Sequence, residues 1–376
     1  MSPGERRPLQ RVADGLGLHR SGRTHRGGRT SVTERMPTID SFEMITYEKQ
    51  DGVATVTINR PRVLNAFNLR TLAELSEAFR DAAWDDSVAV VVVTGAGDRA
   101  FCTGGDVKEF AEQYTRRPHQ YWKYMAQFIE CHDRLRRIGK PTVARINGIV
   151  VGGGNELNLA CDLAIMAQHA YIQQVGTRMS SVAAAGATQW LPITVGDRRA
   201  REILWLCEEI EAQKCLEWGL VNQVVPSIRG ADGNYLDVKT LAEVRTALQD
   251  PNNRIDLTAL DEAVAAMCQK LIDKFPDSLR YTKQQTNFWR ELVWAMTSGH
   301  AQEWLTLHFA WLETYEGMRA FMEKRPPDYR GLRRRAAEGR STEFLWGPYE
   351  KTCSRCGAQG LPSEFRFCGQ CGAALQ

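Results

Sequence analysis

Two glycine-containing segments and one carboxylate have the residue types and spacing for acyl chemistry. The first segment reads AFCTGGDVK over residues 100–108, and the second reads NGIVVGGGNEL over residues 147–157. Two backbone N–H groups that point at one oxygen stabilise the charge that develops on a reacting carbonyl, and a neighbouring carboxylate can move a proton. The pattern therefore predicts an oxyanion hole from the amides of Thr103 and Gly153, with Glu156 as general acid or base.

Each of these features also has an ordinary structural interpretation. A glycine triplet is typical of a tight connection from a strand to a helix, and a glutamate in the first turn of a helix favours the helix dipole. The flanking sequence favours the functional interpretation, because residues 88–95 (VAVVVVTG) and 141–148 (PTVARING) predict buried strands that lead into the two loops. A helix is predicted over 157–167. Partial removal of the Glu156 carboxyl from water is expected to raise its pKa.

The elements that must position these loops follow an alternating pattern. Residues 54–59 (ATVTIN) predict a strand and residues 69–83 predict a helix, and the two strand-and-loop units come next. This order is expected of repeated ββα units in an α/β fold. Residues 1–38 contain eight arginines and almost no large apolar residue, so we expect this extension to be disordered.

Composition excludes several classes of protein. A chain of 376 residues with 43% hydrophobic residues can bury a large core, and we expect one main domain with appendages. The net charge of +3 gives no reason to expect nucleic acid as a partner, and no apolar run approaches the roughly 20 residues that cross a bilayer. Six of the ten cysteines are scattered without a disulfide framework, which fits a reducing cytoplasm: Cys102, Cys131, Cys161, Cys207, Cys215 and Cys268.

The other four cysteines have the spacing of a metal site. Cys353 and Cys356 form one C-x-x-C-G pair, and Cys368 and Cys371 form a second. Four thiolates at this spacing are typical of tetrahedral zinc, and in so short a segment the metal replaces a hydrophobic core. Since all four ligands come from the protein, the sequence predicts structural zinc. The module either only orders the C-terminus or docks a protein partner.

Several motifs in the same order resemble the crotonase (enoyl-CoA hydratase/isomerase) superfamily. They are the two glycine segments, RPRVLNA at 60–66, the stretch 198–226 and EGMRAFMEKRP at 316–326, and the resemblance covers about 45–331. It implies a crotonase-like superhelix of ββα units, a C-terminal helical region that forms trimers or hexamers, and an enzyme that stabilises a thioester enolate. Coenzyme A enters as part of the substrate, and the resemblance assigns it to Arg62, Leu64, Gly105, Lys108, Phe321 and Lys324.

The residues around Gly176 narrow the branch of the family. Counting back from Gln189 places Gly176 where the hydratases carry a second glutamate. The segment 174–183 is similar to the branch of naphthoate synthases and 6-oxocyclohex-1-ene-1-carbonyl-CoA hydrolases. Naphthoate synthases carry an aspartate where Ala183 stands, whereas the ring hydrolases carry a histidine near Met179 and an aspartate near Ala184.

The resemblance therefore implies an enzyme that adds water to, or hydrolytically cleaves, a cyclic or conjugated acyl-CoA. An ordinary enoyl-CoA hydratase or isomerase is one alternative. A non-catalytic relative that docks a partner through its zinc ribbon is another. We expect a disordered extension at 1–38, a core domain at 39–265, a helical region at 266–349 and the ribbon at 350–376, in a cytoplasmic protein that binds neither nucleic acid nor membrane.

Further polar and aromatic residues have two interpretations each. Some side chains can position water or a ring carbonyl but more often make structural hydrogen bonds: His169, Arg178, Ser180, Ser181 and Gln189. Tyr121, Trp122 and Tyr124 have helical spacing, which favours core or trimer packing over a lid on a cyclic acyl group. Large apolar residues over 288–311 exceed what one helix needs for its own domain, which favours oligomerisation.

Overall fold

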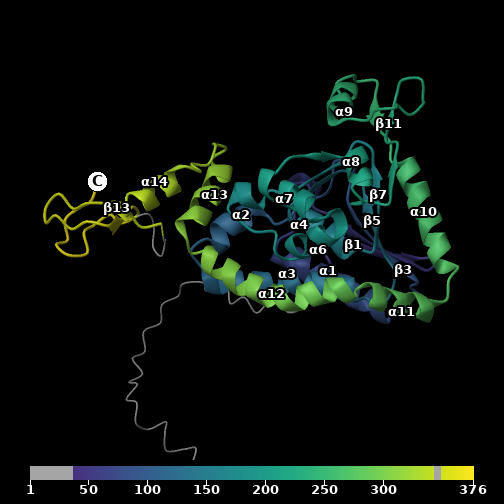
Figure 1. The fold of residues 1–376 in the computed structure, drawn as a ribbon, viewed down its shortest axis with the longest axis horizontal. Coiled ribbons are helices and arrows are strands. Elements are labelled where there is room, and N and C mark those ends of the chain that lie inside the picture. The colour runs from purple at the N-terminus through teal and green to yellow at the C-terminus, as the bar shows by residue number, and fades with distance from the viewer. Residues whose placement is uncertain (1–36, 343–348) are drawn as a thin grey trace, which may run out of the picture. The chain divides into compact units, whose positions relative to one another are not determined.

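The computed structural model describes residues 37–342 and 349–376 of the chain (Figure 1). Nearly all of the extension predicted to be disordered, residues 1–38, lies outside the described residues. Thr38 is described, and its backbone N–H and carbonyl both bond the Ser41 hydroxyl at a short 3₁₀ turn, η1 (Ile39–Ser41). The described part of the chain therefore opens with a short turn directly before the first strand.

A six-stranded sheet forms the centre of the fold. Its order is β1-β2-β3-β5-β7-β10, with β1 antiparallel to β2 and the other neighbours parallel. The strands are β1 (Ile45–Gln50), β2 (Val53–Ile58), β3 (Val90–Gly95), β5 (Thr142–Ile146), β7 (Leu163–Ala167) and β10 (Gln223–Val225). Every residue of β3 is buried, which explains its unbroken apolar run.

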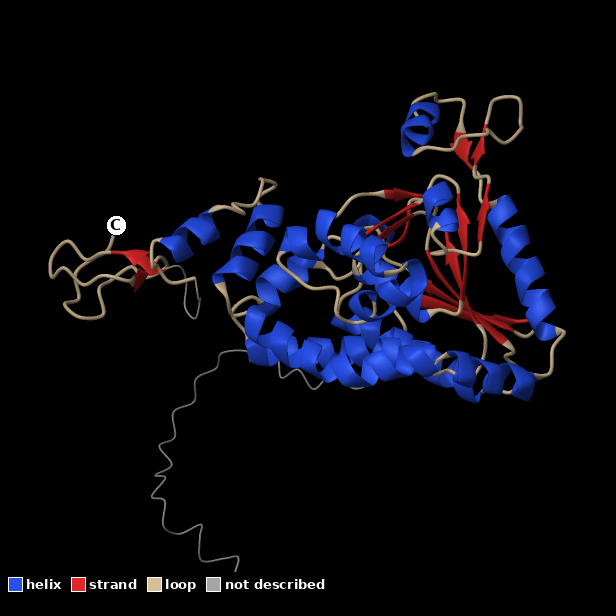
Figure 2. Cartoon of the chain, in the orientation of Figure 1, coloured by secondary structure: helices blue, strands red, loops and turns tan. Residues whose placement is uncertain are grey.

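Helices cover both faces of this sheet (Figure 2). Val91 and Val93 of β3 face the larger core, which includes residues of α1 (Leu69–Trp84) and α3 (Pro118–Arg136). Val90 and Val92 face the opposite way and pack with residues of α10 (Thr258–Ile272). The alternation is the two-residue side-chain period of a strand.

A second, four-stranded sheet brings the two glycine loops together. Its order is β4-β6-β8-β9, and its strands are β4 (Ala100–Cys102), β6 (Ile149–Val151), β8 (Tyr171–Gln173) and β9 (Ile210–Glu211). β4 and β6 are parallel neighbours, with Cys102 opposite Val150. Both loops therefore leave the same edge of this sheet, because parallel strands end at the same side.

The sequence predicted the elements before the second loop correctly and one element after it wrongly. The strands predicted at 54–59, 88–95 and 141–148 are β2, β3 and β5, and the helix predicted at 69–83 is α1. The helix predicted over 157–167 is wrong: α4 (Gly153–Ala160) ends at Ala160, and LAIMA forms strand β7. A short apolar run is compatible with a helix or a strand. Here it forms a strand because it pairs with β5 and β10.

The C-terminal part is mainly helical. It comprises α10, α11 (Pro276–Thr286), α12 (Phe288–His308), α13 (Leu312–Met322), α14 (Gly331–Ala337) and a hairpin of β13 (Tyr349–Lys351) with β14 (Leu361–Pro362). α12 packs on α3 and on α6 (Ala187–Val195). The predicted division into domains stays a prediction, although α10 runs continuously through residue 265.

The remaining elements connect these parts. The connections are η2 (Pro61–Val63), α2 (Val107–Glu109), the π-helical turn η3 (Phe110–Tyr114), α5 (Gly176–Met179), α7 (Asp197–Leu206), α8 (Ala212–Glu217), α9 (Leu241–Ala247), β11 (Ile228–Arg229) and β12 (Arg254–Ile255). Among the described residues, no helix has the length and apolar character needed to span a membrane.

Candidate active site

The two glycine loops touch each other at Gly104. Its φ is +82°, and a Cβ there would lie 2.8 Å from the Gly153 nitrogen. Only glycine combines that backbone conformation with so close an approach. The Phe67 amide donates to the Gly104 carbonyl at 2.9 Å, and the Asp106 amide donates to the Phe67 carbonyl at 2.9 Å. These bonds fix the first loop to the segment that carries Phe67.

The amides of Thr103 and Gly153 are available to a ligand. Within the described part of the chain, neither amide donates a hydrogen bond to the protein. Gly153 is the first residue of α4, where the amides have no partner within the helix and the helix dipole favours negative charge. The Thr103 hydroxyl is already used, because it donates to the Leu64 carbonyl at 3.2 Å.

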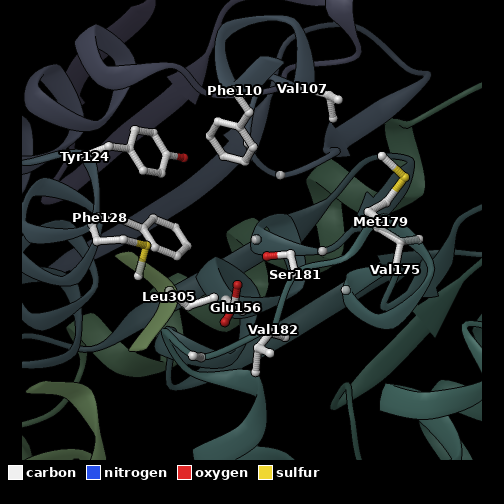
Figure 3. A pocket seen from close by; sticks show the side chains of 18 of the residues that line it. Val107, Phe110, Tyr124, Phe128, Glu156, Val175, Met179, Ser181, Val182 and Leu305 are labelled. Carbon is white, nitrogen blue, oxygen red and sulfur yellow. The ribbon is translucent and has the colours of Figure 1, made fainter. Parts of the chain in front are cut away.

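Glu156 lies in the first turn of α4 and faces the same cavity (Figure 3). The residue is only 4% exposed. Its Oε1 accepts from the Ala185 amide at 2.8 Å and, at 3.5 Å, from the Ala187 amide. No described residue bonds Oε2, so one oxygen is anchored and the other is left for a ligand.

Burial raises the pKa of Glu156 to about 7, and the two amide hydrogen bonds oppose that rise. Desolvation disfavours the charged carboxylate, so the proton is held more tightly than in water. Near neutral pH both protonation states are populated. A group in this range can accept a proton in one step and return it in another.

Two connected cavities meet at the glycine loops. The inner cavity has a volume of about 110 Å³ and is lined by Thr103, Gly153 and Glu156 together with a wall of aromatic side chains. The outer cavity is larger, about 710 Å³. The two share several lining residues, namely Thr103, Gly105, Val107, Val175 and Met179. A ligand can therefore extend from one cavity into the other.

The outer cavity contains five of the six residues expected to bind coenzyme A. They are Arg62, Leu64, Gly105, Lys108 and Phe321. Lys324 does not line it: the chain turns after α13, and Lys324 takes a left-handed conformation with a φ of +54°. Three further residues that can donate hydrogen bonds also line this cavity, namely Arg178, Arg325 and Tyr329. Arg325 is already paired with Glu316.

Gly176 has no room for a side chain. It begins α5, and a Cβ at this position would lie 2.9 Å from the Ser181 carbonyl oxygen. A second glutamate would need the loop that follows to move. Glu109 is the other carboxyl whose pKa burial raises to about 7, but it accepts from the Leu69 amide at the start of α1 and lines neither cavity. Among the described residues, the inner cavity therefore has a single carboxylate, Glu156.

Other candidate polar residues separate into two groups. The His169 ring bonds the Ser227 hydroxyl and the Asp98 carbonyl, and Gln189 donates to the Ala184 carbonyl, which are structural bonds. Ser181 lines the inner cavity beside Glu156 (Figure 3), and Arg178 lines the outer one. Met179, Ala183 and Ala184 also line the inner cavity and bring no ionisable side chain to it.

One face of α3 forms much of the inner wall. Tyr121, Tyr124, Met125 and Phe128 recur at helical spacing and all line the inner cavity, together with Phe110. Packing against the core was the expected role of Tyr121 and Tyr124, and the structure places them in the cavity as well. The helical spacing was visible in the sequence, but only the fold shows which cavity this face borders.

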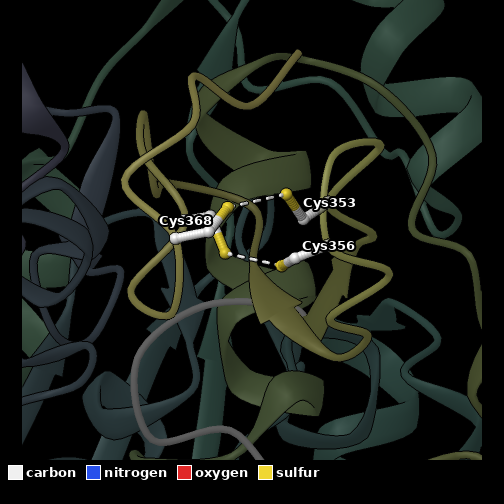
Figure 4. A group of neighbouring side chains, drawn as sticks. Cys353, Cys356 and Cys368 are labelled. Carbon is white, nitrogen blue, oxygen red and sulfur yellow. Dashed lines mark hydrogen bonds between the residues drawn. The ribbon is translucent and has the colours of Figure 1, made fainter.

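The four C-terminal cysteines cluster (Figure 4). Their Sγ atoms lie within 4.8 Å of one another, with Cys353 to Cys371 and Cys356 to Cys368 each 3.6 Å apart. Four sulfurs around one zinc at about 2.3 Å are separated by about 3.8 Å. The donor set therefore fits zinc.

The comparisons with known proteins agree with the fold. The family model described as Enoyl-CoA hydratase/isomerase matches residues 48–248. This chain belongs to the enoyl-CoA hydratase/isomerase family. It is therefore an enzyme of the crotonase type that acts on coenzyme A thioesters, and its α/β architecture is the crotonase fold.

A curated relative and two solved structures illustrate the similarity. The chain is 31% identical over 334 residues to a 6-oxocyclohex-1-ene-1-carbonyl-CoA hydrolase of Geobacter metallireducens, covering 79% of this chain and 87% of the relative. An enoyl-CoA hydratase from Bacillus anthracis is 29% identical with a TM-score of 0.55, covering 77% and 100%. An enoyl-CoA hydratase/isomerase from Mycobacterium paratuberculosis matches the fold with a TM-score of 0.62 at 22% identity, covering 76% and 99%.

The pKa of Glu156 generates a first prediction. Glu156→Gln should lower kcat by roughly 10²- to 10⁴-fold, the usual contribution of a general acid or base. For the wild type, kcat/KM should decrease as the pH is lowered through about 7, because the carboxylate becomes protonated. The residual activity of the variant should not show this decrease. Turnover within a few-fold of wild type would remove Glu156 from the chemistry.

The same group couples stability to pH. Because the folded state holds this proton more tightly than the unfolded state, its contribution to stability is full below pH 4.5 and declines as pH rises to about 7. The contribution is measured from the free energies of unfolding in denaturant of wild type and Glu156→Gln, each determined between pH 4.5 and about 7. Parallel pH dependences would contradict the buried, proton-holding state.

The Gly153 amide generates a second prediction. Gly153→Pro removes the N–H at a position where a helix tolerates proline, but a Cβ there would lie 2.5 Å from the Phe67 ring. Gly153→Ala is the matched control, because it keeps the N–H and meets the same ring. The proline variant should lose about 10²-fold more kcat than the alanine variant. Equal losses would mean that crowding, not the donor, is responsible.

Proposed function

We propose that this enzyme adds water to a cyclic conjugated oxoacyl-CoA and then opens the ring by hydrolysis, as a 6-oxocyclohex-1-ene-1-carbonyl-CoA hydrolase does. The observation that carries this proposal is the inner cavity, where Glu156 and two free amides face a closed aromatic wall. An engineered apolar cavity of about 150 Å³ accepts benzene. A volume of about 110 Å³ that opens toward a larger cavity therefore suits one six-membered ring better than a long acyl chain.

The first half of the reaction is hydration. The thioester oxygen accepts hydrogen bonds from the Thr103 and Gly153 amides. Glu156 takes a proton from water while the water oxygen bonds the β-carbon, and the electron pair of the double bond moves toward the thioester oxygen. Glu156 then returns the proton to the α-carbon. One water has been added, and the carboxylate is regenerated.

The second half is hydrolytic cleavage of a carbon–carbon bond. A second water loses a proton to Glu156 and adds to the ring carbonyl next to the α-carbon. The bond between these two carbons then breaks, and its electron pair moves to the α-carbon and is stabilised as the thioester enolate on the same two amides. Protonation of the α-carbon by Glu156 leaves a ring-opened carboxylic acid that is still joined to coenzyme A. The two halves together consume two waters.

The single carboxylate favours this reaction over an ordinary hydratase mechanism. Two glutamates that share one water would require a side chain at Gly176, and the Ser181 carbonyl would have to move to make room for it. In the proposed reaction one group accepts and returns each proton in turn, for which a pKa of about 7 is suitable.

The outer cavity is proposed to hold coenzyme A. Arg62, Lys108 and Arg178 supply positive charge for its phosphates, and Leu64, Gly105 and Phe321 supply backbone and apolar contacts. In this proposal the thioester lies where the two cavities share lining residues.

A panel of three coenzyme A thioesters tests the function. The 6-oxocyclohexenoyl, cyclohexenoyl and linear crotonyl thioesters are incubated with enzyme, and products are identified by mass. We expect the oxo ring thioester to gain two waters, the plain ring thioester to gain one, and crotonyl-CoA to react slowest. Preference for the linear thioester would support an ordinary enoyl-CoA hydratase or isomerase, and no turnover of any would support the non-catalytic alternative.

We further propose a homotrimer or a hexamer built from trimers. Several large apolar side chains of α12 are exposed in the single chain, among them Phe288, Trp289 and Met296. Phe275, just before α11, is 82% exposed. Exposed apolar area of this kind marks an association surface.

Oligomerisation generates the third prediction. The chain should sediment at three or six times its monomer mass at micromolar concentration, and Met296→Glu should shift it toward monomer by burying a charge in the interface. Glu262→Gln, an exposed position on α10, is the control. A wild-type monomer would contradict the proposal.

The C-terminal cysteines are proposed to bind one structural zinc per chain. The two halves of the site are built alike: the Gly357 amide donates to the Cys353 carbonyl and the Gly372 amide to the Cys368 carbonyl, each at 2.9 Å. Such turns aim each cysteine pair at a shared centre. Four protein ligands leave zinc no position for substrate, so its part is to stabilise this module or a surface that docks a protein.

Metal content generates the fourth prediction. Purified protein should contain about one equivalent of zinc, and Cys356→Ser with Cys371→Ser should lose it. Truncation before Thr352 should leave most acyl-CoA activity, since the candidate active site lies elsewhere. Cys215→Ser, in the core, controls for loss of a thiol. Less than half an equivalent of metal, or inactivity of a folded truncated protein, would overturn the structural assignment.

A further inference from the structure

The inner cavity contains two buried phenols that have no partner. Tyr121 and Tyr124 are each 2% exposed, and both line the cavity that contains Glu156. In the part of the chain that the structure describes, neither hydroxyl makes a hydrogen bond. Both residues open into the cavity, so each hydroxyl is free to donate to an oxygen atom of a ligand held there. Two such groups in one small cavity indicate that a ligand supplies the missing partner.

We propose that Tyr121 and Tyr124 form a recognition site for an oxygen carried by the acyl ring, and that they select oxygen-bearing rings over plain hydrocarbon rings. The proposal rests on the proposed ring substrate. It adds a specificity-determining pair to the chemistry assigned to Glu156 and the loop amides.

The positions of the rings support a shared binding site. The two residues are three apart on α3, and their rings stack with centroids 5.7 Å apart and an interplanar angle of 16°. Both residues line the same small cavity, so one ligand can reach both. In Figure 3 the Tyr124 hydroxyl points toward Phe110, and Glu156 lies on the other side of the cavity.

Neighbouring rings hold both tyrosines in place. The rings of Tyr121 and Phe309 stack with their centroids 3.5 Å apart. The Phe110 ring is nearly perpendicular to both tyrosine rings, with centroid distances of 6.0 Å to Tyr121 and 5.0 Å to Tyr124. Phe128 continues the stack beyond Tyr124 at 6.1 Å. A rigid wall keeps the hydroxyls directed without loss of side-chain entropy on binding.

The phenols act as donors and not as bases. Burial raises the pKa of both hydroxyls, and the nearby negative charge of Glu156 adds to the rise for Tyr121. They therefore stay protonated at neutral pH, and a carbonyl oxygen is a suitable acceptor. During carbon–carbon cleavage the ring carbonyl oxygen becomes negatively charged when water adds, and two donors on it would stabilise that charge.

A comparison of binding in an inactive background tests the pair directly. Glu156→Gln is expected to slow turnover by roughly 10²- to 10⁴-fold, so the dissociation constants of 6-oxocyclohexenoyl-CoA and cyclohexenoyl-CoA can be measured by calorimetry on the full chain before much ligand reacts. These thioesters differ only in the ring oxygen. We expect the oxo thioester to bind at least tenfold more tightly, because the hydrocarbon ring leaves buried donors unpaired.

Adding Tyr121→Phe and Tyr124→Phe together should remove this preference. Affinity for the oxo thioester should fall at least tenfold, while affinity for the plain ring stays the same or rises. Phe128→Leu is the control, since it changes the wall without removing a hydroxyl and should affect both thioesters alike. Thermal unfolding confirms that each variant is folded.

The outcomes separate this inference from the proposed function. An equal effect of the double phenylalanine variant on both thioesters would overturn the recognition site and leave a packing role. Absence of any preference before the substitutions would overturn it as well. Failure of wild-type enzyme to open the oxo ring would contradict the proposed function, whereas the binding ratio still decides the role of the phenols.

Discussion

The close approach of Gly104 to the Gly153 amide is the constraint on which the site depends. β4 and β6 end side by side, and their loops touch where any larger residue would collide. This contact brings two free N–H groups, from segments about fifty residues apart, to one cavity. The Glu156 carboxylate lines the same cavity as these two residues.

Glu156 depends on the same arrangement. Because α4 begins at Gly153, its first turn carries both the free Gly153 amide and the Glu156 carboxylate. The amides of the following loop hold one carboxylate oxygen, so the other can serve the substrate. Burial then raises the pKa of the group into the range where proton transfer in both directions is efficient. The position of the Glu156 carboxyl and its raised pKa thus both follow from its place in the buried first turn of α4.

The sequence was sufficient for the local parts of this account. The two loops and Glu156 could be predicted because they depend on residues that are close in the sequence. Each loop has glycines at a fixed spacing after an apolar run, and the carboxylate follows the second set of glycines. The assignment of LAIMA to a helix was wrong because strand pairing with β5 and β10 is not visible locally. The catalytic roles themselves stay predictions.

Long-range packing decided what the sequence left open. Tyr121 and Tyr124 show helical spacing, but their place beside Glu156 depends on how α3 lies against two distant loops. The lack of space for a side chain at Gly176 also depends on tertiary structure, because it is the Ser181 carbonyl that occupies that space. Lys324 was expected near the ligand from its motif, and the turn after α13 takes it out of the cavity of its own chain.

Exchange of the α-proton of a saturated ring thioester, cyclohexanecarbonyl-CoA, in heavy water tests enolate stabilisation most directly. This compound has no double bond or ring carbonyl, so only removal and return of the α-proton can occur. The account predicts that wild-type enzyme incorporates one deuterium, detected by mass, and that Glu156→Gln slows incorporation by at least about 10²-fold. No exchange by an enzyme that turns over its own substrate, or undiminished exchange in the variant, would contradict it.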